Sequence, residues 1–522
     1  MLCFLYFSLT MKRVFVLLFF FNFYNLHSQN QTVGLFVNAN QAYQGYTLFS
    51  PNVNTYLIDN CGKLINSWNS LYNAGSSVYL LEDGSILRAC RIQNPVFSAG
   101  GGGGRVEKTD WYGNLEWSYD FSDSLYHQHH DIAPMKNGNI LILCWEYKSL
   151  SESIAAGRDP NSMIDNELWS TYILEVEPIG SDSMNIVWEW HLWDHLIQDF
   201  DSTKNNYGVI SQNPQLLNIN YYNGNGKNDW LHCNSINYNE ELDQIVIGSR
   251  SLSELYVIDH STTTLEASSS IGGDSNKGGD FLFRWGNPAV YNAVNTDQKL
   301  FGQHDVHWID YNLPDGGKFL IFNNGKQRGY SSVDIVSPLI DTSGNYVIDS
   351  VNMFGPLSAE WIYTSNPLQN FYSSYISGAQ RLANGNTLIC DGAHGDFFEI
   401  DSLNNIVWRY VNPVLNTYIL SQGDSIPITQ NGFGNSVFRA TRYSIDFPGF
   451  ANKDMTPSDP IELNPLPDSC IMLTTRNTNL NNKKELLKIV DLMGRNTMRI
   501  KNTILFYIYS DGTVEKVFRL SH

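Results

Sequence analysis

The amino-acid sequence predicts an all-β protein, in which a six-bladed β-propeller is followed by a small C-terminal β-module. Short runs rich in Val, Ile, Tyr and Trp recur between clusters of Gly, Asn and Asp, as strands and turns do. No long segment has the 3.6-residue apolar period of a helix. Similar hairpins repeat at irregular spacings, on the order of 50 to 100 residues, which is the scale of a four-stranded blade.

Two sequence patterns recur and define the blades. In the first, a polar turn precedes an aromatic strand, and it begins at Asp59, Asp110, Ser183 and Ser402. In the second, two apolar strands flank a tight turn, as in a β-hairpin. The hairpins are "YLLEDGSILRAC", "IAPMKNGNILILC", "INYNEELDQIVIGSR", "IDYNLPDGGKFLIFNNG" and "AQRLANGNTLICDG". The segment from Phe397 to about Ser444 supplies the sixth blade. Long insertions, such as residues 192–227, disfavour a β-sandwich or a β-helix.

Both ends of the chain differ from the propeller, which we place at residues 29–445. Residues 1–28 are predicted to be a signal peptide, and Met11 is a second candidate for its true start. From Met11 the chain runs through the basic "MKR", an apolar run and a polar end with a cleavage point at Ser28. The apolar run is too short to span a bilayer, and we expect no transmembrane segment. Residues 446–475, rich in proline, are predicted to be a linker, and residues 476–522 the separate β-module.

Charge and cysteine content limit the possible partners. The formal net charge is −19, so nucleic acid and anionic membrane surfaces are excluded as main partners. Cys3 lies in the leader, and the other cysteines form no C-x-x-C pair, which favours buried thiols that pack as small hydrophobic side chains. These are Cys61, Cys90, Cys144, Cys233, Cys390 and Cys470.

Histidines and arginines recur at the ends of the predicted hairpins. A residue that opens the first strand and a residue that follows the second strand lie at the same end of a hairpin. His130, His232 and His304 open hairpins, whereas Arg250, Arg328 and His394 follow second strands. If the hairpins are equivalent parts of equivalent blades, these six side chains gather at one end of the propeller axis, where ligands usually bind.

This combination of side chains favours an oxyanion over a metal ion. Arginine binds sulfate or phosphate through two hydrogen bonds, and imidazole adds further donors. The stretch "HQHHD" at residues 127–131 lacks the spacing of a zinc site, and strand alternation sends only part of it into one site. No metal and no cofactor are therefore predicted. A further imidazole can act as a nucleophile, and His394 is the candidate from the late blades because it is the only histidine between His307 and His522.

Two other features have structural interpretations. The glycine run 100–104 lacks the G-K-[ST] ending of a phosphate-binding loop and is predicted to be a flexible loop. The tryptophans of the aromatic strands are predicted to pack between blades. They are Trp117, Trp188, Trp190 and Trp408.

The chain resembles the arylsulfotransferase family, the bacterial aryl-sulfate sulfotransferases that do not use phosphoadenosine phosphosulfate. The matching segments span Gly45 to about Pro413 and include "HHDIAPMKNGNILIL", "DWLHCNSINYNEELDQIVIGSR", "GQHDVHWIDYN" and "QRLANGNTLICDGAHGDFFEID". The resemblance implies a six-bladed propeller and a ping-pong transfer of sulfuryl from a phenolic sulfate ester to a phenol through a sulfohistidine. Carried over by motif, His232, His304 and Arg328 hold the sulfuryl oxygens and His394 is the nucleophile, while His130 and Arg250 line the funnel. The group that protonates the leaving phenolate is left open.

The C-terminal module resembles the sorting domain of type IX secretion substrates. The resemblance rests on "VDLMGR" at residues 490–495, the strand "ILFYIY" and "DGTVEKV" at residues 511–517. It implies that the type IX secretion machinery is a partner, and that the protein passes through the periplasm to be secreted or held at the outer cell surface.

Two alternatives to a sulfotransferase remain open from the sequence. One is a non-catalytic secreted propeller that binds carbohydrate or protein and keeps its histidines for structural reasons. The other is a metal-dependent hydrolase or lyase on the same scaffold.

Overall fold

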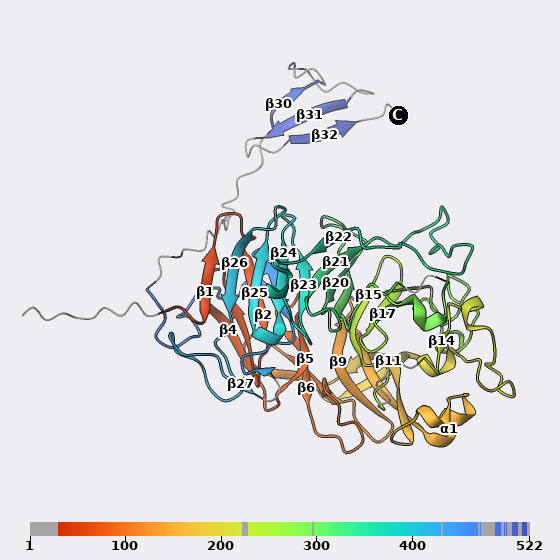
Figure 1. Ribbon diagram of the computed structural model, residues 1–522. Helices are drawn as coiled ribbons and strands as arrows, with labels where there is room; N and C mark the ends of the chain where they lie inside the picture. Colours follow the sequence, from red (N-terminus) through yellow and green to blue (C-terminus); the bar gives the residue numbers. More distant parts are fainter. Residues whose placement is uncertain are drawn as a thin grey trace, which may run out of the picture.

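The computed structural model describes residues 30–221, 228–294, 297–429 and 432–467, residue 470, and, in the C-terminal module, three strands with residues 491, 495 and 497. Six antiparallel sheets of at least four strands each form the blades of a propeller (Figure 1). The first strands of successive blades contact one another from β5 through β9, β15, β19 and β23 to β29, whose residue bounds follow. The predicted fold class is confirmed.

The first three blades follow one another in the chain. Blade 1 contains β5 (Ala74–Leu80), β6 (Ile86–Arg91), β7 (Gly104–Thr109) and β8 (Leu115–Asp120). Blade 2 contains β9 (Tyr126–Pro134), β10 (Ile140–Ser149), β11 (Glu167–Ile179) and β12 (Ser183–His191). Blade 3 contains β15 (Cys233–Asn239), β16 (Gln244–Ser249), β17 (Glu254–Asp259) and β18 (Phe283–Trp285).

The last three blades include the strand that closes the ring. Blade 4 contains β19 (His304–Trp308), β20 (Phe319–Asn323), β21 (Ser332–Val336) and β22 (Trp361–Tyr363). Blade 5 contains β23 (Gly378–Arg381), β24 (Thr387–Asp391), β25 (Asp396–Ile400) and β26 (Ile406–Val411), with β1 (Gly34–Asn38) on its edge. Blade 6 contains β29 (Ala440–Ser444), β2 (Gly45–Phe49), β3 (Asn54–Ile58) and β4 (Leu64–Asn69).

Blade 6 joins the two ends of the propeller sequence. Its first strand, β29, comes late in the chain and pairs antiparallel with β2, so that Thr47 faces Arg442. The strand β1 pairs in turn with β26, with Leu35 opposite Tyr410. Because early and late segments share two sheets, the ring closes by β-pairing within one chain. The prediction that the segment from Phe397 to about Ser444 supplies the sixth blade is corrected, since Phe397 lies in blade 5 and that segment gives blade 6 only β29.

Aspartate turns explain the first repeated pattern of the sequence. In the turn between β7 and β8, the Asp110 carboxylate accepts hydrogen bonds from the backbone N–H groups of Tyr112 (2.9 Å) and Asn114 (2.8 Å). An aspartate that satisfies its own turn in this way favours the chain reversal before an outer strand. The same arrangement recurs at Asp59, Asp341, Asp349 and Asp401.

Tryptophans of the outer strands link one blade to the next. Trp68 of β4, for example, donates its indole N–H to the carbonyl of Asp110 in the neighbouring blade (2.8 Å). A buried indole needs a hydrogen-bond acceptor, and the turn of the next blade supplies one. The other pairs of this kind are Trp117 with Ser183, Trp188 with Thr262, Trp285 with Pro356 and Trp408 with Asn60. The blade-packing role predicted for Trp117, Trp188, Trp190 and Trp408 is confirmed, since all four are buried.

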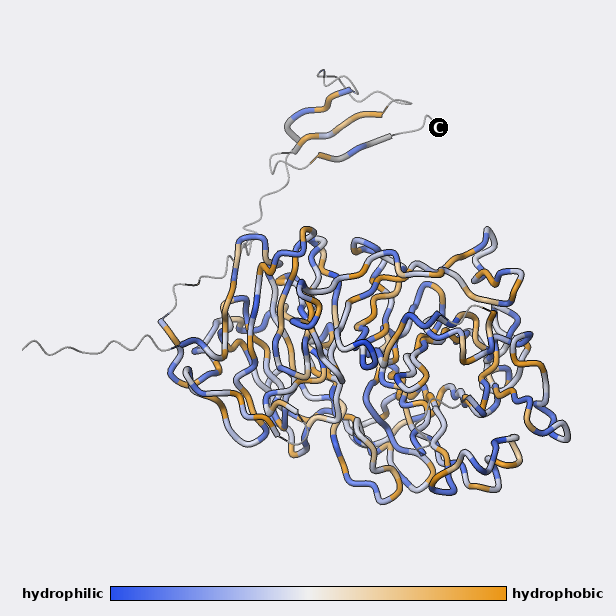
Figure 2. The backbone as a smooth tube through the Cα atoms, viewed as in Figure 1, coloured by the Kyte–Doolittle hydropathy of each residue, from blue (hydrophilic) through white to orange (hydrophobic). Residues whose placement is uncertain are grey.

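The remaining elements are insertions between strands. They are two short helices, α1 (Leu150–Ala155) and α2 (Thr264–Ala267), the parallel pair β13 (Leu196–Ile197) and β14 (Leu217–Asn218), and the hairpin of β27 (Ile428–Thr429) and β28 (Gly432–Phe433). Hydrophobic and hydrophilic residues alternate over short lengths along the propeller (Figure 2). No helix in the described part of the chain is both long enough and apolar enough to cross a membrane.

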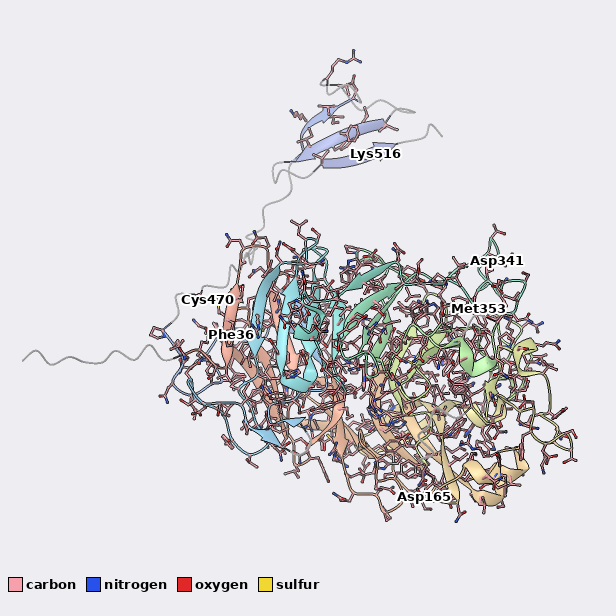
Figure 3. The ribbon with its side chains drawn as sticks, in the orientation of Figure 1. Phe36, Asp165, Asp341, Met353, Cys470 and Lys516 are labelled. Carbon is pink, nitrogen blue, oxygen red and sulfur yellow. A yellow bond between two sulfur atoms is a disulfide. The ribbon has the colours of Figure 1, made fainter. Side chains whose placement is uncertain are left out.

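A disulfide fastens the segment that follows the propeller. Cys61, in the turn between β3 and β4, bonds to Cys470 across a Cα–Cα distance of 5.7 Å. Cys470 lines a cavity together with Phe36 of β1 (Figure 3). The sequence predicted six buried thiols, so Cys61 and Cys470 are corrected, whereas Cys90, Cys144, Cys233 and Cys390 are free and buried as expected. The pairing was not predictable because 409 residues separate the two cysteines.

The expected linker runs along blade 6 in its first part. The backbone N–H of Ser458 donates to the carbonyl of Leu64 (2.8 Å), and that of Leu64 donates to the carbonyl of Asp459 (3.3 Å). After it, β30 (Leu486–Val490), β31 (Ile504–Tyr509) and β32 (Val514–Phe518) form the predicted separate β-module, as a three-stranded antiparallel sheet. The predicted signal peptide, residues 1–28, lies outside the described residues.

Candidate active site

One repeated hydrogen bond links the first strands of successive blades. In each case a side chain of one blade accepts the backbone N–H of a residue in the next blade. The pairs are Asp131 with Ile236 (3.3 Å), Ser235 with Val306 (3.2 Å) and Asp305 with Ala379 (3.0 Å). The residues that precede these acceptors, His130, Asn234 and His304, therefore occupy equivalent positions. His232 lies two residues before that position, so the expected equivalence holds for His130 and His304 only.

The backbone bends sharply beside each of these histidines. His130 has φ 52°, His232 has φ 49° and Asp305 has φ 55°, which are left-handed values that residues other than glycine rarely adopt. The strand register shifts near each of them, as at a β-bulge. A bulge redirects the side chains around it, and such bulges are common beside active sites.

Four of the predicted side chains lie together at one end of the propeller axis. The rings of His130 and His232 are 4.6 Å apart, centre to centre. The backbone N–H of Arg250 donates to the carbonyl of His232 (3.2 Å), which closes the hairpin as predicted. Burial, followed by the nearby charges of Arg250 and His232, holds the pKa of His304 well below its usual range. Burial and the charges of His232, His304 and Arg250 also hold the pKa of His130 well below its usual range.

Asn324 fixes the tautomer of His304. The Asn324 amide nitrogen donates to the carbonyls of Ser373 (2.8 Å) and Ile376 (2.9 Å), so its oxygen is the acceptor toward His304. That oxygen lies 2.7 Å from Nδ1 of His304, and Nδ1 must therefore carry the hydrogen. The lone pair of the neutral ring is on Nε2, which accepts a long hydrogen bond from the N–H of Ile376 (3.2 Å).

His232 is backed by a buried carboxylate. Its Nδ1 is hydrogen-bonded to Asp229, whose second oxygen accepts the indole N–H of Trp145 at 2.9 Å. Burial raises the pKa of the Asp229 carboxyl, but His232 and the hydrogen bonds lower it by a larger amount. The net effect is a lowered pKa. An imidazole that is oriented by a carboxylate has the arrangement of a general acid or base.

In the stretch "HQHHD", some side chains pack against aromatic rings and one belongs to the site. His129 stacks on Trp145 with ring centres 4.2 Å apart, and His127 stacks with Phe97 and bonds Ser122 (2.8 Å). Only His130 joins the group around Arg250, and its Nδ1 lies 2.9 Å from Nδ1 of His129. The expectation that only part of the stretch enters one site is confirmed.

The glycine run is a packing surface for this stretch. The carbonyl of Gly101 accepts the N–H of His130 (2.8 Å), and the N–H of Gly103 donates to the carbonyl of Gln128 (3.1 Å). A Cβ on Gly101 would lie 1.9 Å from Cε1 of His130, and Gly101 also has φ 84°. The predicted flexible loop is thus wrong for this run, because its backbone is hydrogen-bonded to "HQHHD" and has no room for side chains at Gly101, Gly103 and Gly104.

Comparison with known proteins agrees with this geometry. A model of the family described as arylsulfotransferase (ASST) matches residues 35–418. The chain belongs to the arylsulfotransferase family. Membership indicates an aryl sulfotransferase, with phenolic sulfates and acceptors as its general substrate class. No curated protein matches the chain.

Solved structures that are similar to this arylsulfotransferase are distant. A protein of unknown function from Bacteroides caccae is 11% identical and has a TM-score of 0.39, with 77% of this chain and 99% of that chain covered. A putative 6-phosphogluconolactonase from Bacteroides fragilis is 10% identical, has a TM-score of 0.36 and covers 78% of this chain and 99% of its own. A streptogramin B lyase is 8% identical, with a TM-score of 0.35 and coverage of 79% and 94%.

Arg328 is not among the four gathered side chains. Its guanidinium donates to the carbonyl of Tyr330 (3.1 Å) and to the hydroxyl of Ser332 (2.5 Å), and it lies over the Tyr330 ring. Arg328 follows β20 by five residues, and the turn carries its side chain back onto its own blade. The contact of Arg328 with the sulfuryl group stays a prediction for this arylsulfotransferase.

His394 is held by a different set of contacts from the other imidazoles. It ends the short 3₁₀ helix η6 (Gly392–His394), bonds the Asp391 carboxylate at 2.8 Å and has its ring 4.6 Å from that of Phe433. The hydrogen bond to Asp391 raises the pKa of His394, against the opposing effect of burial. The Asp391 carboxylate orients the His394 ring through Nδ1, as Asp229 orients the ring of His232, and the role of His394 as nucleophile stays a prediction.

Sequence reasoning missed two polar residues that orient the histidines. Asp229 lies three residues before His232, in "NDWLHC", and Asn324 directly follows β20, where Arg250 follows β16 in the preceding blade. The hairpin pattern contains a signal for Asn324, because it follows the second strand of its hairpin at the same position as Arg250. In the described part of the chain, no group of three or more His, Cys, Asp or Glu side chains is arranged to hold a metal ion.

The substitution Gly101→Ala is expected to displace His130. The new methyl group would occupy the place of the imidazole, and alanine disfavours φ 84°, so we expect a loss of about 1 to 3 kcal/mol in the free energy of unfolding. Aryl sulfate turnover should fall by at least about tenfold, that is about 1.4 kcal/mol. Gly100→Ala is the matched control, because a Cβ there meets nothing within 4 Å. Equal activity of the two variants would contradict this role of Gly101.

Proposed function

We propose that the protein transfers a sulfuryl group from a phenolic sulfate ester to a phenol by a ping-pong mechanism, without phosphoadenosine phosphosulfate. The observation that carries the proposal is the arrangement around His304. A neutral imidazole, held in one tautomer by Asn324, lies next to Arg250 and two further imidazoles. Family membership supports the same class of reaction.

Arg250 and His130 are placed to hold the sulfuryl oxygens. A guanidinium binds a tetrahedral oxyanion through paired hydrogen bonds and stays charged at all physiological pH values. Burial lowers the pKa of Arg250, and the nearby charge of Asp229 partly offsets this effect. In a site from which water is largely excluded, such donors stabilise the charge that develops on the equatorial oxygens during transfer.

His304 is the nucleophile in this proposal, and His394, which Asp391 orients, is the alternative nucleophile. The Nε2 of His304 gives up the hydrogen bond from the Ile376 N–H and attacks the sulfur with the freed lone pair. The sulfur–oxygen bond of the ester breaks, and the phenolate leaves with the electron pair. Nδ1 of His304 keeps its hydrogen toward Asn324, so the sulfated ring is cationic at nitrogen while the sulfuryl group remains anionic. The transition state resembles that of phosphoryl transfer, in which positioning and electrostatics dominate.

The Asp229–His232 pair supplies the proton transfers that the sequence left unassigned. His232 gives a proton to the leaving phenolate in the first half-reaction. In the second half-reaction it takes the proton of the acceptor phenol, whose oxygen attacks the sulfur and releases His304. Asp229 holds Nδ1 of His232, so that Nε2 faces the reacting oxygen in both steps.

A chromogenic aryl sulfate tests the proposed reaction. With 4-nitrophenyl sulfate as donor, we expect release of 4-nitrophenol that depends on added phenol and yields phenyl sulfate, because the second half-reaction needs an acceptor. Chelators and removal of small molecules by dialysis should leave the rate unchanged. No release with any aryl sulfate would favour a non-catalytic propeller, and loss of activity with a chelator would favour a metal-dependent hydrolase.

We further propose that residues 476–522 direct export by the type IX route, and that the mature protein is secreted or held at the outer surface. The proposal is supported by the strands β31 and β32, which coincide with the segments "ILFYIY" and "DGTVEKV" that resemble the sorting domain.

Deletion of residues 476–522, in a host that has the type IX machinery, should leave an active propeller trapped in the periplasm. Cell fractionation with an activity assay measures this, and the full chain is the control. Release of the shortened protein into the medium at the rate of the full chain would contradict the sorting role.

A further inference from the structure

A buried arginine meets two carboxylates at the centre of the propeller. Arg439 directly precedes β29, and its side chain is only 16% exposed. Its guanidinium lies 2.6 Å from the Asp131 carboxylate and 3.1 Å from that of Asp305. The hydroxyl of Tyr79 accepts a hydrogen bond from Arg439 (3.1 Å) and donates one to Asp131 (2.8 Å). Four blades of the ring thus meet at one side chain.

The two carboxylates belong to residues that directly follow the histidines of the site. Asp131 comes after His130, and Asp305 comes after His304, within the bulges that carry the left-handed backbone angles. Each aspartate also accepts a backbone N–H from the next blade. A shift of either carboxylate therefore moves the backbone on which the neighbouring imidazole is mounted.

The charge balance of this group depends on Arg439. Asp131 and Asp305 are 1% and 4% exposed, and buried carboxylates require a cation or several hydrogen bonds. Although burial lowers it, the charges of Asp131, Asp305 and Tyr79 raise the pKa of Arg439 well above its usual range. A lysine retains the charge but lacks the planar fork that reaches both carboxylates and the tyrosine at once.

We propose that Arg439 is a positioning residue for sulfuryl transfer, which fixes the imidazoles of His130 and His304 by holding Asp131 and Asp305 together. The proposal rests on the proposed function for its catalytic consequence. Because Arg439 belongs to the segment that closes the ring, the catalytic geometry is completed only when the last propeller strand has paired with the first ones.

Arg442 is a matched control on the same strand. It is more deeply buried than Arg439, with its side chain 0% exposed, pairs with the Glu399 carboxylate at 3.2 Å and lies over the ring of Trp408. Its guanidinium instead donates to Thr47, to the carbonyl of Tyr43 and to Glu399, so its hydrogen bonds are made around blades 5 and 6. A purely structural role of a buried arginine in β29 should therefore be shared by both residues.

The test combines nuclear magnetic resonance of labelled histidine rings with kinetics, on the full chain and its variants Arg439→Lys, Arg439→Gln and Arg442→Lys. In both Arg439 variants we expect the ring signals of His130 and His304 to move, while those of His195, which is held by Asp280, stay in place. The kcat for 4-nitrophenyl sulfate should fall by at least about tenfold, with KM changed by less than about threefold. Arg442→Lys should alter neither ring signals nor kcat.

Two results would overturn the positioning role. One is a folded Arg439→Lys variant in which the His130 and His304 signals are unchanged. The other is an Arg442→Lys variant with the same signal shifts and the same loss of kcat. If Arg439→Gln fails to fold, the lysine variant decides. If the unaltered protein does not turn over aryl sulfates while the Arg439 variants still move both signals, the proposed function fails and the positioning of the two imidazoles stands.

Discussion

The buried charges on the propeller axis constrain most of the site. Asp131 and Asp305 are removed from water, and both face the guanidinium of Arg439. Removing one partner of such a group leaves an uncompensated charge in a medium of low dielectric, which is far more costly than breaking a surface ion pair. Each aspartate also accepts a hydrogen bond from a backbone N–H of the next blade, so the ion pairs and the packing of the blades stabilise each other. The backbone of the histidines that precede them is therefore held in place.

The side chain that binds Nδ1 determines how each of two imidazoles in the site can react. Asn324 is oriented by two backbone carbonyls, and its oxygen leaves His304 with a hydrogen on Nδ1 and a lone pair on Nε2. Asp229 instead presents a carboxylate to His232. An amide partner favours a neutral ring and a carboxylate partner a ring that exchanges protons, so neighbouring histidines of one site can serve different roles.

The fold and part of the site were predictable from the sequence. Alternating apolar strands and turns such as Asn137-Gly138 are local signals, and they predicted the blades and the common end at which His130, His232, His304 and Arg250 meet. The position of a residue in a hairpin determines the end of the blade at which it lies, but it does not determine the direction of the side chain. Arg328 therefore turns back onto Tyr330, and His394 turns toward Asp391.

Contacts between distant parts of the chain could not be read in the same way. Arg439 meets Asp131 across 308 residues, and Cys61 meets Cys470 across 409. Neither pair belongs to a local motif, and each depends on the ring having closed. The packing of the glycine run on "HQHHD" is a similar case, because it follows from the contact of blade 1 with blade 2 and from no pattern within the run itself.

The most direct test of the account is the location of the sulfuryl group in the covalent intermediate. The protein would be incubated with excess 4-nitrophenyl sulfate and no acceptor, quenched and digested under alkaline conditions that preserve sulfohistidine, and mapped by mass spectrometry. The account predicts the group on His304, at a level approaching one per chain, and its loss on addition of phenol. A sulfuryl group on His394, or the absence of any labelled histidine while the donor is consumed, would contradict it.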